Sequence, residues 1–264
     1  DGVWRRYAPF VIRVSEDEID PYMVYRLIEP GYETWGEMGI YQRCLETFRE
    51  EPVIETSSAG YGCINCHTFR SQDPDMMLFH MRQTHAGTML LREGRIERLN
   101  TATDSTISST VYPSWHPSGR YIAFSVNATK LITLPDESNR VEVFDSASDV
   151  VVYDTERHEL YSVPELMRGD RFETFPSFSP AGDKLYFCTA DSVEMPARYK
   201  EARYSLCSIG FDAASGRLGR DVDTLCNART TGRSVSFPRV SPDGAFMLYA
   251  LSDYGTFSIW HRDA

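Results

Sequence analysis

The residues best suited to chemistry lie in one short stretch, Gly62-Cys63-Ile64-Asn65-Cys66-His67-Thr68-Phe69, which contains the pattern C-x-x-C-H. Two thiols at this spacing can form thioether bonds with the vinyl groups of a haem, and the histidine that follows can ligate its iron. We expect the second axial ligand to be His80, because Leu78-Phe79-His80-Met81 has the pattern of a strand that would hold an imidazole firmly. The other side chains that could serve are Met76, Met77, Met81 and His85. The sequence therefore predicts a site for haem c made of Cys63, Cys66, His67 and His80.

The same stretch supports a competing zinc site. Cys63, Cys66, His80 and His85 follow the spacing C-x2-C-x13-H-x4-H, which suits a tetrahedral zinc ion. A DNA-reading zinc finger is disfavoured by the acidic charge of the chain and by Pro74, so the zinc would be structural. A disulfide between Cys63 and Cys66, a thioredoxin-like pair or free thiols complete the alternatives, although no βαβ pattern supports the redox pair.

Turn-forming residues surround the C-x-x-C-H motif. Ser57-Ser58-Ala59-Gly60 precedes it and Ser71-Gln72-Asp73-Pro74 follows it. Clusters of such residues are typical of loops. We therefore expect the motif to lie on a loop within an N-terminal segment, residues 1–75, that also contains strands and a short helix. The propeller repeats follow in residues 76–264, with both parts in one structural unit.

Elements that could position this motif are indicated by an internal repeat. Three segments share the pattern aromatic-Pro-x-x-x-Pro-x-Gly at intervals of about 62 to 63 residues. They begin at Tyr112, Phe175 and Phe237. The Pro-x-Gly part is turn chemistry, because proline fixes one corner of a turn and glycine accepts the positive φ of the next. Each repeat therefore predicts a strand, a tight hairpin turn and a second strand.

Two further strands follow in the first two repeats. The expected second, third and fourth strands are Tyr121 to Val126, Val150 to Asp154 and Glu159 to Val163 in the first repeat, and Leu185 to Thr189, Tyr204 to Phe211 and Leu218 to Leu225 in the second. In the third repeat the expected second strand is Phe246 to Leu251. Four antiparallel strands per repeat make the blade of a β-propeller. The predicted fold class is therefore all-β, with the polar excess of each repeat in rim loops at Lys130 to Arg140, Ala190 to Ala202 and Asn227 to Ser236.

Through these three segments, roughly residues 110 to 264, the chain resembles the TolB-like, WD40-like (PD40) propeller repeat family. The family's blades continue past the second strand, whereas this sequence ends at Ile259-Trp260-His261-Arg262-Asp263-Ala264, inside a blade. The resemblance therefore implies a propeller that is incomplete or closed by N-terminal strands. Such strands are expected at Ala8 to Val14, Pro21 to Ile28, Met76 to Arg82, Thr88 to Leu91 and Arg95 to Leu99, with one helix at Glu37 to Glu50.

A wider resemblance rests on Cys-Ile-Asn-Cys-His followed by Met-Leu-Phe-His, and on the segments Asp20 to Ile28 and Gly39 to Arg43. These resemble a group of exported proteins of Gram-negative bacteria labelled as cytochrome c biogenesis or multihaem-associated proteins. The resemblance implies a periplasmic or cell-envelope location and a protein partner there. It does not establish an activity.

Composition narrows the classes of partner. The net charge of -11 disfavours nucleic acid and anionic membranes. No apolar run approaches the roughly 20 residues of a membrane-spanning helix. The sequence begins at Asp1 rather than Met, so a signal peptide or a lipid anchor would belong to a removed N-terminal segment.

Catalytic motifs are not found. The nucleophile elbow G-x-S-x-G, the P-loop and the dinucleotide fingerprint do not occur in the sequence. Trp115 and His116 occupy repeat positions, which predicts a core aromatic and a turn residue, and Cys188, Cys207 and Cys226 fall on predicted strands as buried thiols, with a cross-strand disulfide as the alternative. The leading hypothesis is a periplasmic propeller that carries or handles a c-type haem. The alternative is a non-catalytic propeller that binds a protein or a glycan, with the cysteine pair purely structural.

Overall fold

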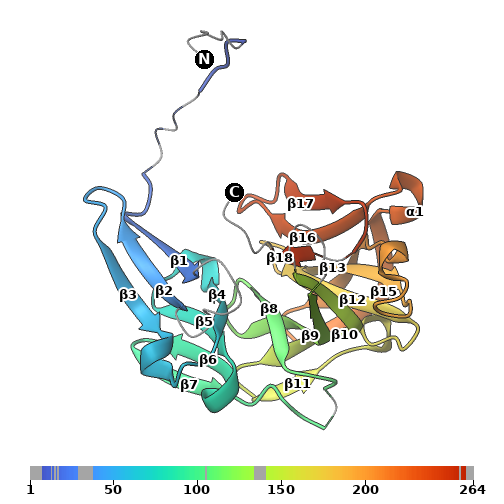
Figure 1. Ribbon diagram of the computed structural model, residues 1–264, viewed down its shortest axis with the longest axis horizontal. Helices are drawn as coiled ribbons and strands as arrows, with labels where there is room; N and C mark the ends of the chain where they lie inside the picture. The colour runs from blue at the N-terminus through green and yellow to red at the C-terminus, as the bar shows by residue number, and fades with distance from the viewer. Residues whose placement is uncertain are drawn as a thin grey trace.

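The computed structural model describes residues 8–12, 14, 16, 18–28, 38–104, 106–133, 141–255 and 257–259. The described chain is almost entirely β-structure, in antiparallel sheets that follow one another in chain order (Figure 1). The single α-helix among the described residues is α1 (Ala228–Thr231). In this part of the chain no helix is both long enough and apolar enough to cross a membrane.

The described residues form five sheets. The first contains β1 (Tyr22–Ile28), β2 (Met38–Cys44) and β3 (Glu50–Glu55). The second contains β4 (Ile64–Phe69), β5 (Met76–Met81), β6 (Gly87–Arg92) and β7 (Arg95–Leu99). The third contains β8 (Thr110–Trp115), β9 (Tyr121–Thr133), β10 (Val141–Asp154) and β11 (Glu159–Tyr161), with β18 (Phe257–Ile259) paired to β10.

The last two sheets complete the series. The fourth contains β12 (Arg171–Phe178), β13 (Lys184–Asp191), β14 (Ser205–Asp212) and β15 (Arg217–Cys226). The fifth contains β16 (Ser234–Val240) and β17 (Met247–Ser252). Short 3-10 helices lie at Thr56–Ala59, Arg70–Gln72, Gln83–His85, Pro164–Leu166 and Tyr199–Glu201. The expected four-stranded antiparallel repeats are thus confirmed in the third and fourth sheets.

The repeated Pro-x-Gly segments form the predicted hairpin turns. Gly119, Gly182 and Gly244 have φ values of 77°, 77° and 73°, a region that glycine adopts without strain. In each turn the glycine N–H donates to the carbonyl three residues earlier, at 2.8 to 2.9 Å. The same local sequence therefore closes the same turn in three successive sheets.

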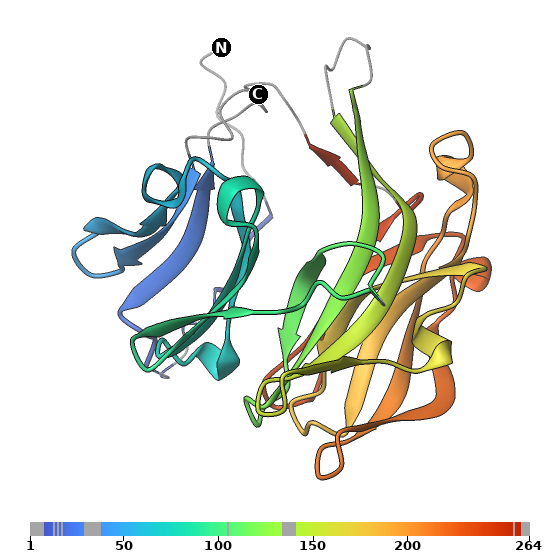
Figure 2. The ribbon, with the colours of Figure 1, turned by 90° about the horizontal axis from the view of Figure 1, so that it is seen from below.

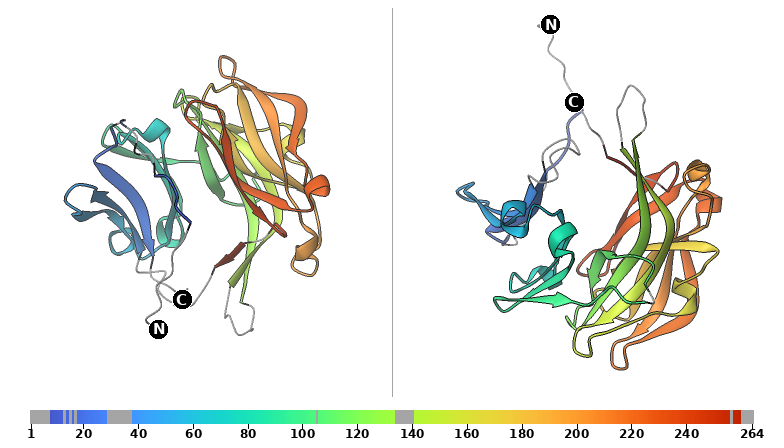
Figure 3. Two further views of the ribbon diagram at one scale, coloured as in Figure 1. Left: turned by 90° about the horizontal axis from the view of Figure 1, so that it is seen from above. Right: turned by 60° about the horizontal axis from the view of Figure 1, so that its bottom comes forward.

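Hydrophobic cores lie between consecutive sheets. One cluster joins the first and second sheets, a second joins the second and third, a third joins the third and fourth, and the last joins the fourth and fifth. Trp115 belongs to the second cluster, as predicted, where it packs with Leu78 and Tyr153. Each sheet is thus held face to face against its neighbours, as Figures 2 and 3 show from several sides.

The predicted helix at Glu37 to Glu50 is wrong. Residues 38–44 form β2, which pairs with β1 on one side and β3 on the other. Met38 and Ile40 are buried in the process. Burial against the second sheet overrides the helical spacing of this segment, because context decides between marginal local preferences.

The other predicted strands and loops agree with the structure in part. Pro21 to Ile28 and the three strands between Met76 and Leu99 are confirmed. In the segment Ala8 to Val14, residues 8–12 and 14 belong to no strand, and residue 13 is outside the described residues. The expected loop at Lys130 to Arg140 is wrong up to Thr133, because β9 continues to that residue, and residues 134–140 are not described.

Candidate functional site

The C-x-x-C-H motif lies on a strand, so the loop predicted for it is wrong. Cys63 immediately precedes β4, and Cys66 and His67 lie within it. β4 pairs with β5, with a register shift between Asn65 and Thr68. The expected boundary between residues 75 and 76 consequently falls between two paired strands of one sheet.

β4 has the same backbone as the inner strands of the following sheets. Cys66, Tyr112, Phe175 and Phe237 have φ values of 53°, 49°, 53° and 51°. Each sits at a register shift between its strand and the next one, two residues before pairing resumes. The motif is therefore a fourth copy of the repeat, in which Cys66 replaces the aromatic residue and His67 replaces the proline.

Both thiols of the motif are held away from solvent. Burial raises the pKa of Cys63 and of Cys66, and the nearby backbone of Tyr112 opposes this effect at Cys66. Burial also lowers the pKa of His67, which favours its neutral form. All six cysteines of the chain are free thiols in the structure.

His80 and His85 occupy different environments. His80 is 4% exposed on β5, and its Nδ1 lies 3.3 Å from the hydroxyl of Thr88. Burial lowers the pKa of His80 to about 4, so its imidazole is neutral at pH 7. His85 ends an exposed 3-10 turn. Among the described residues no three His, Cys, Asp or Glu side chains converge as metal ligands would. A zinc ion here would require the turn with His85 and the strand β4 to rearrange.

His116 has a structural role at the turn, as its repeat position predicts. Its Nε2 lies 3.0 Å from the carbonyl oxygen of Gly182 in the next sheet, and its Nδ1 lies 2.8 Å from the hydroxyl of Ser118. Cys188 and Cys207 are buried thiols, and Cys226 is half-buried. None of these side chains forms a site for chemistry.

A different site emerges at one end of the fourth sheet. There the start of β12, the β13–β14 connection and the segment from β15 to α1 surround a cavity of about 780 Å³. This end also carries the long β9–β10 hairpin, visible in Figure 2. The expected rim loop at Ala190 to Ala202 is confirmed from residue 192 onward and provides one wall. We call this hollow the arginine cavity, after Arg171, Arg198, Arg203 and Arg229, which line it.

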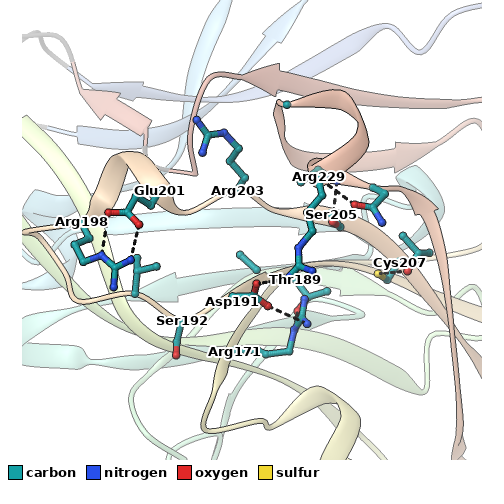
Figure 4. A pocket seen from close by; sticks show the side chains of 16 residues that line it. Arg171, Thr189, Asp191, Ser192, Arg198, Glu201, Arg203, Ser205, Cys207 and Arg229 are labelled. Atoms are coloured by element: carbon teal, nitrogen blue, oxygen red, sulfur yellow. Dashed lines mark hydrogen bonds and ion pairs between the residues drawn. The ribbon is translucent and has the colours of Figure 1, made fainter.

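Ion pairs order two sides of the arginine cavity (Figure 4). On one side Asp191 accepts from two arginines, Arg171 at 3.2 Å and Arg229 at 2.7 Å. On the other side Arg198 forms a bidentate pair with Glu201 at 2.9 and 2.5 Å. Asp191 is thus shared, which leaves positive charge around it uncompensated.

A smaller cavity of about 250 Å³ adjoins the first, and Arg171 and Thr189 line both. Its lining includes Glu173, which is 1% exposed. The carboxylate of Glu173 accepts only long hydrogen bonds, 3.3 Å from the backbone N–H of Arg168 and 3.4 Å from the hydroxyl of Thr189. Burial, the largest effect, raises its pKa to about 7.

The arginine cavity was not predictable from any single stretch of the sequence. Its arginines come from the first residue of β12, from the β13–β14 connection and from α1, and no local motif marks them. A usable signal existed in the length of the second repeat, because its excess residues had to form rim loops. The charged residues of those loops can also be counted in the sequence.

These sheets define the class of protein. Successive antiparallel sheets, with their inner strands β4, β8, β12 and β16 next to one another, are the arrangement of a β-propeller. No family model and no curated protein matches the sequence. The fold assignment therefore depends on solved structures.

Solved propellers bear out the fold. A TolB-like protein from Agrobacterium tumefaciens is similar with a TM-score of 0.56 and 14% identity, covering 83% of this chain and 64% of that one. The GH74 xyloglucanase from Xanthomonas campestris gives 0.55 and 10%, covering 90% and 34%. A puromycin-hydrolyzing peptidase from Mycobacterium tuberculosis gives 0.52 and 12%, covering 84% and 33%.

At 10 to 14% identity, the similarity to these structures shows the fold alone. The chain spans less than two thirds of each of these three proteins. None of them is described as a cytochrome or a cytochrome biogenesis protein, so the comparison leaves that part of the resemblance without support.

Proposed function

We propose that this chain is the propeller part of an exported, non-catalytic binding protein, which holds a protein or glycan partner at the rim of its fourth sheet. The observation that carries the proposal is the arginine cavity, since rim loops on a rigid sheet are where propellers place their binding residues. The TolB-like neighbour is consistent with a cell-envelope location and a protein partner there.

In this proposal the C-x-x-C-H motif is a structural strand. Cys66 and His67 take the positions that an aromatic residue and a proline take in the other repeats. The motif would therefore position the second sheet against the third, as the equivalent residues do for the later sheets.

Photo-crosslinking at the rim tests the proposal. With benzoylphenylalanine in place of Arg203, irradiation of cells that naturally produce the protein is expected to give one covalent adduct, because this position borders the arginine cavity. The same replacement at Arg95, exposed on β7, is the control and is expected to give none. Adducts from both positions, or from neither, would contradict rim binding.

A c-type haem on Cys63, Cys66 and His67, with His80 as distal ligand, is the second candidate. It is favoured by the motif and by the closeness of the two thiols, each of which is free. When bound, haem would supply electron transfer or be handed to a partner. For both imidazoles to ligate iron, His67 would have to leave the backbone of Val24 and His80 would have to leave Thr88.

Mass spectrometry of natively produced protein separates the two candidates. We expect the peptide that contains Cys63 and Cys66 to carry no covalent addition, because both thiols are buried against the neighbouring sheet. A haem adduct on this peptide, together with a Soret band, would establish the haem candidate instead. Metal analysis of the same sample addresses zinc, for which stoichiometric metal lost in His80→Ala or His85→Ala would be the positive result.

A further inference from the structure

We propose that the arginine cavity binds a sugar acid, a ligand that carries a carboxylate beside vicinal hydroxyl groups. This inference rests on the proposed function and names the chemistry of the partner at the same site. The charge, the hydrogen-bonding groups and the volume of the cavity support it.

Charge in the cavity is opposite to that of the chain. Four arginines line it against two carboxylates, Asp191 and Glu201, a local balance of +2 in a protein of net charge -11. Glu201 is matched by Arg198, whereas Asp191 is shared by Arg171 and Arg229. Within the described residues Arg203 has no ion-pair partner within 4.0 Å. A concave basic patch on an acidic surface concentrates small anions.

Guanidinium groups select the type of anion. A planar guanidinium donates two parallel hydrogen bonds to a carboxylate, and several of them can surround a single anionic group. Arg171 forms an ion pair with Asp191 through one nitrogen at 3.2 Å, and its Nε donates to Thr189 at 3.0 Å, which fixes the side chain. A ligand carboxylate beside Arg229 would meet a guanidinium that Asp191 already holds at 2.7 Å, and Arg203 would add a second donor.

The other polar residues that line the cavity favour a ligand that also carries hydroxyl groups. The carboxylates of Asp191 and Glu201 are acceptors, and Ser192, Ser205 and Asn227 add groups that both donate and accept. No aromatic ring occurs among the sixteen lining residues, all of which are described. An aromatic or apolar side chain of a peptide would find little to pack against, whereas vicinal hydroxyls would satisfy both charged and neutral oxygens.

The volume of the arginine cavity and its opening to solvent agree with a sugar acid as the ligand. About 780 Å³ lies within the range of about 300 to 1,000 Å³ that small-molecule sites occupy. The side chains of Arg198, Arg229 and Asp191 are 56%, 84% and 58% exposed, so the cavity is open to a residue of a longer glycan. A terminal or internal uronate residue could therefore enter with its neighbours outside.

Calorimetric titration of the full chain at low ionic strength tests the inference with four probes: D-glucuronate, D-glucose, acetate and inorganic phosphate. We expect glucuronate to bind at least ten-fold more tightly than each of the others. Arg171→Gln and Arg229→Gln are each expected to weaken glucuronate binding at least ten-fold, whereas Arg95→Gln on β7 leaves it unchanged. Circular dichroism checks that each variant is folded.

The other outcomes separate the two levels of the proposal. Phosphate or acetate binding as tightly as glucuronate would overturn the sugar-acid assignment in favour of a plain anion site. No binding of any probe, while the crosslink at position 203 persists, would remove the sugar acid and leave rim binding in place. Loss of both would remove the proposed function as well.

Discussion

Replacing Thr68 by proline is expected to lower the free energy of unfolding by about 3 kcal/mol or more, whereas replacing His67 by proline is expected to change it by less than about 1 kcal/mol. The two positions are adjacent, so the contrast depends mainly on the backbone, although His67→Pro also removes the contact of the imidazole with the backbone of Val24. Thr68 is paired with Leu78 on β5, and proline there would remove a ladder hydrogen bond. His67 lies inside the register shift, at the position that proline occupies as Pro113 in the third sheet.

Urea unfolding followed by circular dichroism measures this contrast, with the wild-type chain as reference. The pair of variants controls for the introduction of proline itself. If His67→Pro proves as damaging as Thr68→Pro, the equivalence between β4 and the later inner strands is wrong. A tolerated His67→Pro would in addition show that the imidazole is dispensable for folding.

Glu173→Gln is expected to stabilise the protein at alkaline pH. The pKa of this buried carboxyl is raised from 4.5 to about 7, so folding opposes its ionisation. The stability that the protonated carboxyl of Glu173 contributes is therefore fully present below the unfolded pKa of 4.5. It is lost as the pH rises from there through the folded pKa of about 7. At about 1.4 kcal/mol per pKa unit, the cost above pH 8 is about 3 kcal/mol. The groups that face Glu173 are Arg168, Arg171, Asp149 and Thr189.

The measurement is the difference in the free energy of unfolding between the wild type and Glu173→Gln from pH 5 to pH 8, in which the contributions of the histidines cancel. Relative to the Gln variant, the wild type should lose stability mainly between pH 5 and pH 7 and reach a plateau above that. Glu159→Gln is the control, because Glu159 is exposed on β11 and its removal should leave the wild-type slope intact. Equal slopes in wild type and Glu173→Gln would contradict the assignment.

Turn chemistry made the later sheets predictable. The three aromatic-Pro-x-x-x-Pro-x-Gly segments mark the inner strands and turns of the third to fifth sheets. The first strand of the second sheet, β4, escaped the same analysis because Cys66 and His67 stand at the aromatic and proline positions, and Ser71-Gln72-Asp73-Pro74 replaces the Pro-x-Gly turn. Cys66 and His67, which suggest haem chemistry in the sequence, thus occupy positions of the structural repeat.

Long-range packing decided what the sequence could not. The segment Glu37 to Glu50 has no β-pattern as clear as that of the repeats, yet β1 and β3 enclose β2 from both sides. The arginine cavity likewise depends on three segments, around Arg171, Arg198 and Arg229, that meet only once the fourth sheet has formed. No local sequence pattern specifies that these three segments come together.

Separate cores between consecutive sheets imply that cooperativity in this molecule is a nearest-neighbour property. The buried residues of each cluster come from two consecutive sheets, and among the described residues Tyr112 of the third sheet also packs against the cluster of the fourth and fifth. The stability of an interior sheet therefore has two main contributions and that of an end sheet has one. Fraying should therefore start at the fifth sheet, where Leu248 is 67% exposed on a strand with one partner. Hydrogen exchange would then advance inward sheet by sheet, like the melting of a short one-dimensional array.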